Sequence, residues 1–212
     1  MMILNGMSIL IIGASHLTYP GALVTTLNDN LLSKGAQVHS IGVCGSTPSQ
    51  WTLVAKSACG GAERIGAAPL NLKLGSKAVT IPVQELLKTE NPKLLIVALG
   101  DTLGDYNNPA GMSLLWAGAE IAQFKRAIAK TKVRCVWVGP SWGEEGFATG
   151  KTFARVQQVS ELLASRVGPC TYINSLNMSK PSEWSTIDGV HYQPQYYQQW
   201  GSKIVEELER LD

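Results

Sequence analysis

Three residue types that together can transfer an acyl group lie at opposite ends of this 212-residue chain. Asp188 and His191 form a compact acid–base pair just before an amphipathic C-terminal segment. Ser15 follows the apolar run of residues 9–12, which places it on the turn after a buried strand. A serine hydroxyl is a poor nucleophile until a base takes its proton, and imidazole titrates near neutral pH. The pattern predicts a nucleophile, a base and an orienting acid.

Each of these residues also has an ordinary interpretation. Ser15 could cap a helix, Asp188 could serve a turn because Asp-Gly favours turns, and His191 could be a polar surface residue. A catalytic role is favoured because the serine, the histidine and the aspartate occur together in one chain. His16 is a weaker candidate for the base, because adjacent side chains rarely share a direction.

Apolar runs alternate with amphipathic segments along the chain, which predicts a three-layer α/β sandwich of the flavodoxin-like kind with about five mostly parallel strands. Strands are expected at residues 7–13, 37–44, 94–99, 135–138 and 171–174. Helices are expected after residue 22 and at residues 112–130, 152–167 and 194–211. Ligands bind at the carboxyl ends of such strands, so four loop positions should converge on one rim: Ser15, Gly45, Thr102 and Ser141.

The length suits a single domain over residues 1–212. Residues 45–92 are too many for a simple connection, so we expect an insertion there, beside the site. Apolar and polar residues alternate over residues 72–82 and the alternation breaks at Gly75, which predicts a small hairpin. Residues 82–89 could form a short helix.

The charge balance is even, with 18 basic and 16 acidic residues and a net charge of +2. No basic stripe occurs, so nucleic acid is not an expected partner, and the apolar runs are too short for a membrane span. No residue pattern predicts a metal or an organic cofactor. The expected partner is a small-molecule or carbohydrate ester, and the oligomeric state stays open.

Four cysteines lack the CxxC spacing of zinc sites. We expect Cys44 to bridge Cys59 and Cys135 to lie near Cys170, because their strands can be neighbours. Such bridges favour a periplasmic or extracellular location, whereas four buried thiols would fit a cytosolic protein.

Two motifs at the ends of the chain resemble the SGNH (GDSL-type) hydrolases. Residues 13–15, Gly-Ala-Ser, followed by Gly21, are similar to the family's first block, with Ala14 where aspartate is usual. Residues 188–191, Asp-Gly-Val-His, closely match its last block. Residues 42–46 resemble the second block, which implies that the backbone N–H groups of Gly45 and Ser15 face the oxyanion. The resemblance spans residues 7–211.

The third block departs from the family. Its usual pattern is Gly-x-Asn-Asp, whereas this chain has Gly100-Asp101-Thr102 and leucine. A threonine hydroxyl donates one hydrogen bond but lacks the fixed geometry of an amide. Losing an oxyanion donor typically costs on the order of 2.7–4 kcal/mol. Either Thr102 substitutes, or Asn107 or Asn108 reaches in, or activity is weak.

The resemblance implies a serine esterase for O-acyl esters, with O-acetyl groups on a glycan as the expected substrate, or an O-acetyltransferase with the same residues. A catalytically silent carbohydrate-binding or assembly module would share the scaffold. A dinucleotide-binding protein is a further alternative, but GxGxxG is absent because His16, Leu17 and Thr18 fill its place. Loop tryptophans are candidate platforms for sugar rings, or else local packing: Trp51, Trp142 and Trp184.

Overall fold

The structure, a computed structural model, describes residues 2–211 of the chain. The strands are β1 (Ser8–Gly13), β2 (Gln37–Val43), β3 (Gly61–Ile65), β4 (Asn71–Lys73), β5 (Leu94–Ala98), β6 (Arg134–Val138) and β7 (Thr171–Ile173). The α-helices are α1 (Leu23–Ser33), α2 (Val83–Glu90), α3 (Leu114–Ile128), α4 (Phe153–Arg166) and α5 (Pro194–Arg210). Short 3₁₀ helices are η1 (Ser15–Leu17), η2 (Pro48–Thr52), η3 (Gly75–Lys77), η4 (Asp101–Leu103) and η5 (Ser175–Met178).

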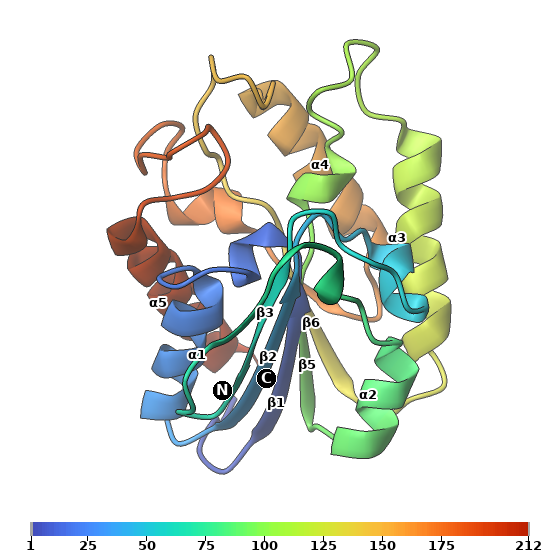
Figure 1. Ribbon diagram of the computed structural model, residues 1–212, viewed down its shortest axis with the longest axis vertical. Coiled ribbons are helices and arrows are strands. Elements are labelled where there is room, and N and C mark those ends of the chain that lie inside the picture. The colour runs from blue at the N-terminus through green and yellow to red at the C-terminus, as the bar shows by residue number, and fades with distance from the viewer. Residues whose placement is uncertain (1, 212) are drawn as a thin grey trace.

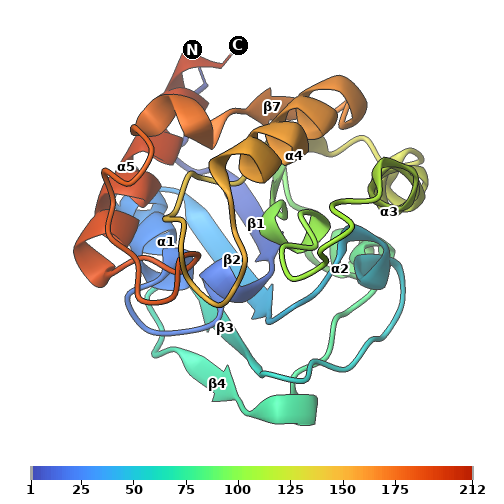
Figure 2. The ribbon, with the colours of Figure 1, turned by 90° about the horizontal axis from the view of Figure 1, so that it is seen from above.

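Within residues 2–211 the strands form one mixed sheet in the order β4-β3-β2-β1-β5-β6-β7. The five strands that the sequence predicts are all present, and their neighbouring pairs are parallel. Helices cover both faces: α1 and α5 lie on one side, and α2, α3 and α4 on the other (Figures 1 and 2). The expected α/β three-layer fold is therefore confirmed.

The alternation of side chains along β1 explains why helices must pack on both faces of the sheet. Successive strand residues point to opposite faces. Ile9 and Ile11 belong to the core that α1 and α5 complete, whereas Leu10 and Ile12 belong to the core beneath α2, α3 and α4. All four side chains are buried, and each fully buried side chain of this size stabilises the fold by roughly 1.5–3 kcal/mol.

Residues 45–92 extend the sheet. β3 pairs antiparallel with β2, and β4 with β3, which adds two strands to the predicted five. The hairpin therefore lies at residues 61–73 and not around Gly75, which begins η3. α2 forms where the sequence predicts a short helix. Whether this segment is an insertion into a smaller domain stays a prediction.

Both expected disulfides are present. Cys44 bridges Cys59 at the end of β2, and Cys135 on β6 bridges Cys170 just before the neighbouring β7. Each pair meets the Cα separation that a bridge requires, at 5.5 Å and 4.5 Å respectively. In the described part of the chain no helix combines the length and apolar character that a membrane span needs.

Candidate active site

Ser15, His191 and Asp188 meet at the carboxyl end of the parallel strands. The Ser15 Oγ lies 2.6 Å from His191 Nε2, and His191 Nδ1 lies 2.6 Å from Asp188 Oδ2. Ser15 and His191 are 176 positions apart in sequence. The fold joins them because Ser15 follows the end of β1 at Gly13 and His191 precedes the start of α5 at Pro194. The structure thus brings together the three residues that the two motifs singled out.

The loop that carries Asp188 and His191 is held by its own backbone. One carboxylate oxygen of Asp188 accepts hydrogen bonds from the backbone N–H groups of Val190 and His191, at 2.9 and 2.8 Å. Gly189 has a φ of +90°, and a Cβ there would lie 2.9 Å from the Cβ of Phe147. Only glycine suits this turn, which explains the Asp-Gly pair in the motif.

The same contacts set the charge of Asp188. Burial raises its pKa, but the hydrogen bonds from His191 and from the Val190 N–H outweigh burial and hold the pKa below its usual value. An ionised Asp188 accepts the Nδ1 proton of His191. That leaves the Nε2 lone pair facing the Ser15 hydroxyl, the tautomer that a general base requires.

A cavity of about 270 Å³ opens at Ser15. Its lining is mostly polar: Ser15, Asp101, Thr102, Asp105, Tyr106, Asn107, Thr149 and Val190. None of these residues comes from residues 45–92, so that segment does not wall this cavity. The lining offers hydroxyl, amide and carboxylate groups, and Val190 is its one aliphatic side chain.

Thr102 lies in this cavity wall, on η4 just after β5. Its Oγ1 is buried and has no hydrogen-bond partner among the described residues. The amides of the two alternative donors are engaged: Asn108 donates to Asp105 at 2.8 Å, and Asn107, with its amide turned to suit its neighbours, donates to the carbonyl oxygens of Thr149 and Ala148. Of these three side chains, Thr102 is the one whose polar atom has no hydrogen bond among the described residues.

Gly45 follows β2, the neighbour of β1, with a φ of +74°. It lines a different cavity, together with the Cys44–Cys59 bridge, and not the one at Ser15. Its role as an oxyanion donor stays a prediction.

The expectation for two of the three tryptophans needs correction. Trp51 is fully buried and donates its indole N–H to Ser46, and Trp184 is buried against Tyr192. A ring with no exposed face cannot stack on a sugar. Trp142 is partly exposed, but its indole N–H donates to the carbonyl oxygens of Leu176 and Ser179. Its contact with substrate stays a prediction.

The sequence pattern does not predict the buried polar cluster that lies beside Ser15. Asp101 contacts His16, Lys151 and Tyr106 through its carboxylate, and His16 also contacts Tyr197. His16 and Asp101 are sequence neighbours of Ser15 and Thr102, which is the one signal that could have marked them. Nothing in the sequence around Lys151 distinguishes it from a surface lysine.

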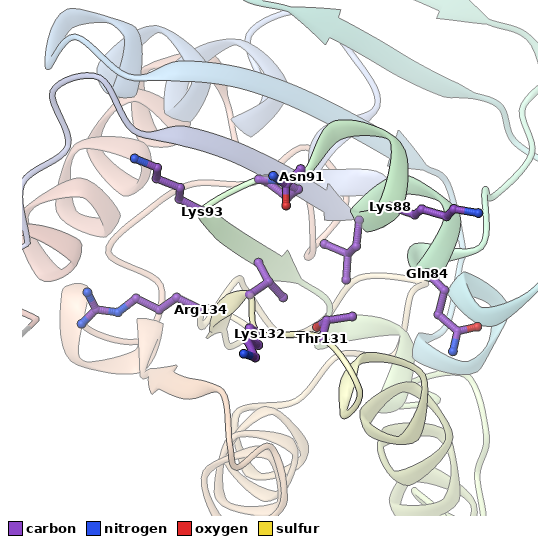
Figure 3. Close-up of a pocket in the computed structure, with 10 residues that line it drawn as sticks. Gln84, Lys88, Asn91, Lys93, Thr131, Lys132 and Arg134 are labelled. Carbon is purple, nitrogen blue, oxygen red and sulfur yellow. The ribbon is translucent and has the colours of Figure 1, made fainter.

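A larger cavity, of about 460 Å³, lies at the other end of the sheet. It is lined by α2, by the residues just before β5 and by those that lead into β6. Figure 3 shows Lys93 and Arg134 extending to one side and Lys88 to the other, so their charges do not converge on a common point. We find no reacting group in it. Nowhere do three or more described histidine, cysteine or acidic side chains group as metal ligands would.

The turn after β1 also bears on the dinucleotide alternative. It leads into the three-residue helix η1 and not into the N-terminus of a long helix. The cradle of backbone N–H groups that binds a pyrophosphate is therefore not formed there.

Comparison with known proteins gives one clear relative in sequence. No protein-family model matches the chain. Protein BcsX of Komagataeibacter xylinus is 36% identical over 214 residues, which cover 99% of this chain and 80% of that protein.

Solved structures share the fold at low identity. A GDSL-like lipase from Bacteroides thetaiotaomicron has a TM-score of 0.61 and is 16% identical, over 96% of this chain and 88% of that one. A peptidoglycan O-acetylesterase has a TM-score of 0.58 at 13% identity, covering 98% and 91% of the two chains. The periplasmic domain of a lipopolysaccharide acetyltransferase from Salmonella ser. Paratyphi A has a TM-score of 0.57 at 13% identity, covering 97% and 84%. By its sequence relative the chain belongs to the family of Protein BcsX, and it shares its fold with the GDSL-like lipase and the O-acetylesterase.

Proposed function

We propose that this protein is a serine esterase that removes O-acyl groups, most of all O-acetyl groups, from a carbohydrate. The observation that carries the proposal is the unbroken hydrogen-bonded chain from Ser15 through His191 to Asp188. The same arrangement of nucleophile, base and orienting acid performs acyl transfer on several unrelated folds.

The reaction follows from this geometry. Ser15 Oγ attacks the ester carbonyl carbon while His191 Nε2 takes its proton. The carbonyl oxygen becomes an oxyanion, which the Thr102 hydroxyl and the backbone N–H groups of Ser15 and Gly45 stabilise. His191 then protonates the leaving alcohol, and an acyl-serine remains. Water, deprotonated by His191, attacks that ester, releases the acid and restores the Ser15 hydroxyl.

The lining of the cavity at Ser15 supports a short acyl group and a polar alcohol. Val190 is the one aliphatic side chain in that lining, and the other groups carry hydroxyl, amide or carboxylate functions. A long alkyl chain would gain little there, because apolar contact area drives its binding. A sugar ring offers hydroxyl groups that these polar side chains can pair with. An acetyl xylan esterase and a peptidoglycan O-acetylesterase are among the proteins that share the fold.

An O-acetyltransferase is the second candidate. In that case a sugar hydroxyl attacks the acyl-serine in place of water. A lipopolysaccharide acetyltransferase domain has the same fold, which supports this second candidate. The two disulfides favour a location outside the cytoplasm for either activity, because thiols stay reduced in the cytosol.

The test is labelling with a fluorophosphonate probe, followed by a screen of aryl esters and acetylated polysaccharides. We expect the wild-type protein and Ser165→Ala, an exposed serine on α4, to react, and Ser15→Ala not to react. We also expect acetyl esters to be cleaved faster than longer acyl esters. Adding a soluble glycan acceptor separates the two candidates, because a transferase forms the acylated glycan in place of free acetate. A wild-type protein that neither reacts nor cleaves any ester would leave the silent module as the better explanation.

A further inference from the structure

A buried polar cluster adjoins the cavity at Ser15. Ser15, Asp101 and Thr102 all line that cavity, and Asp101 also contacts His16, the sequence neighbour of Ser15. His16 Nε2 lies 2.8 Å from Asp101 Oδ2, and the two side chains are 8% and 10% exposed. Since His16 belongs to η1 and Asp101 to η4, this contact ties together the loops that follow β1 and β5.

A third loop joins at the same carboxylate. Lys151, from the loop between β6 and α4, places its Nζ 2.6 Å from Asp101 Oδ1, and its side chain is 1% exposed. The Tyr106 hydroxyl donates to the same oxygen at 2.7 Å. Asp101 therefore accepts from groups on three loops that follow adjacent parallel strands.

The protons of the cluster have defined positions. Burial raises the pKa of Asp101, but the Lys151 charge and the His16 contact outweigh it and hold the pKa far below its usual range. Burial lowers the pKa of His16, which keeps the ring neutral. Neutral His16 therefore donates from Nε2 to Asp101 and accepts at Nδ1 from the Tyr197 hydroxyl, 2.7 Å away. Tyr197 in turn accepts from Tyr19 at 2.6 Å.

Stability alone does not account for such a cluster. Taking a lysine and an aspartate out of water is costly, and well-packed apolar residues of the same volume commonly stabilise a fold as well or better. What ionic groups with fixed hydrogen-bond directions add is a unique geometry. Here that geometry is imposed on η1 and η4, the short helices that carry Ser15 and Thr102.

We propose that His16, Asp101 and Lys151 are positioning residues, which fix η1 against η4 so that the Thr102 hydroxyl meets the oxyanion formed at Ser15. The inference rests on the proposed esterase activity. The cluster supplies through rigid loops the donor geometry that a threonine hydroxyl lacks by itself. It is the reason that a chain with Thr102 where the family has asparagine keeps an oxyanion site.

The experiment compares two replacements of His16. His16→Leu removes both ring nitrogens at similar volume, whereas His16→Gln keeps an N–H donor directed at Asp101. We expect kcat on an aryl acetate to fall at least tenfold in His16→Leu, with KM changed less than twofold, and His16→Gln to recover most of that loss. His39→Gln, at the far end of the sheet between two glutamates, is the matched control and should keep the wild-type kcat.

A second variant guards against misfolding. Asp101→Asn alone leaves a buried lysine without its counter-charge, so the double variant Asp101→Asn/Lys151→Met removes both charges together. We expect it to unfold in urea at a midpoint near that of the wild type and still to lose at least tenfold in kcat. Wild-type kcat in a folded His16→Leu or double variant would overturn the positioning role alone. A wild-type protein inert to esters and to the fluorophosphonate would overturn the esterase proposal and this inference with it.

Discussion

Thr102 is the side chain that we propose as an oxyanion donor. It stands where the SGNH motif that this sequence resembles has asparagine, and its hydroxyl is buried without a partner among the described residues. A buried unpaired hydroxyl typically costs about 1–3 kcal/mol. Its retention at the cavity beside Ser15 is understandable if the partner arrives only with the substrate.

Thr102→Val tests whether the hydroxyl of Thr102 takes part in catalysis. Valine keeps the shape and removes the hydroxyl, so we expect kcat to fall by about tenfold or more. Unfolding in urea should show equal or greater stability, because an unsatisfied group has been removed. Steady-state kinetics with an aryl acetate and urea titration measure the two effects. An unchanged kcat would assign the oxyanion to the backbone N–H groups alone.

At the scale of elements, the position of Ser15 depends on how closely η1 approaches β2. Leu17, at the end of η1, lies directly over Gly42, where an added Cβ would come within 2.1 Å of the Leu17 carbonyl oxygen. That oxygen is backbone, so η1 itself would have to move. The glycine thus sets the height of the nucleophile above the sheet.

Gly42→Ala should therefore abolish most turnover. We expect a loss of stability of about 1–3 kcal/mol, as for other overpacked sites, and a fall in kcat beyond what unfolding explains. Gly118→Ala on α3 is the control, since its Cβ would meet nothing within 4 Å and alanine favours a helix. It should keep the wild-type kcat. If Gly42→Ala kept the same kcat as Gly118→Ala, the close packing of η1 would be irrelevant to activity.

His39 joins three elements at the opposite end of the sheet. On β2, it contacts Glu63 of β3 and Glu90 of α2, at 3.1 and 2.9 Å, and Lys73 of β4 also pairs with Glu63. Burial lowers the pKa of His39, but the two glutamates outweigh burial and raise it above its usual value. Contacts with Lys73 and His39 outweigh burial at Glu63 and lower its pKa.

This contact should stabilise the fold in a defined pH range. A histidine whose pKa is raised by folding contributes fully below its unfolded pKa of about 6.5 and loses its contribution as pH rises through the folded value. We therefore expect His39→Gln to lower the Tm most near pH 5.5, where Glu63 is still ionised, and least near pH 8.5. Thermal unfolding of both proteins across this range measures it. A difference that grew with pH would contradict the ion-pair account.

For the molecule as a whole, the disulfides close loops at both sides of the sheet. Cys44 and Cys59 are separated by 15 positions beside the antiparallel strands. Cys135 on β6 and Cys170 just before β7 are separated by 35 positions. Cys135 and Cys170 are buried. β7 has three residues and lies at the edge of the sheet, so it gains most from a covalent tie to its neighbour.

The Cys135→Ala/Cys170→Ala variant should cost about 3–4 kcal/mol in the free energy of unfolding, mainly because the unfolded chain gains freedom. Urea titration under non-reducing conditions measures this. Cys135 lies at the start of β6, away from the rim that carries Ser15, so kcat of the folded variant should stay near the wild-type value. A loss below about 1 kcal/mol would mean that packing, and not the bridge, holds β7.

Local patterns in the sequence determined the framework of this protein. The apolar run that ends at Gly13 predicts β1, because a strand buried on both faces must be apolar throughout. The sequence also predicts β2, β5, β6 and β7 where the structure has them. Helical periodicity predicts α3, α4 and α5 to within two residues at each end. The motif residues Ser15, Asp188 and His191 could be found because their spacing is local within each block.

What lay beyond the sequence depends on contacts between distant segments. Strands β3 and β4 are short and partly exposed, so they carry no strong pattern. They form because β3 pairs with β2 and β4 pairs with β3. Trp51 and Trp184 look like loop residues, and only packing reveals that they are core. The cluster of His16, Asp101 and Lys151 joins residues up to 135 positions apart. A charged side chain at the end of a strand gives the same sequence pattern whether it faces water or a buried partner. The tertiary structure alone decides which of the two it faces.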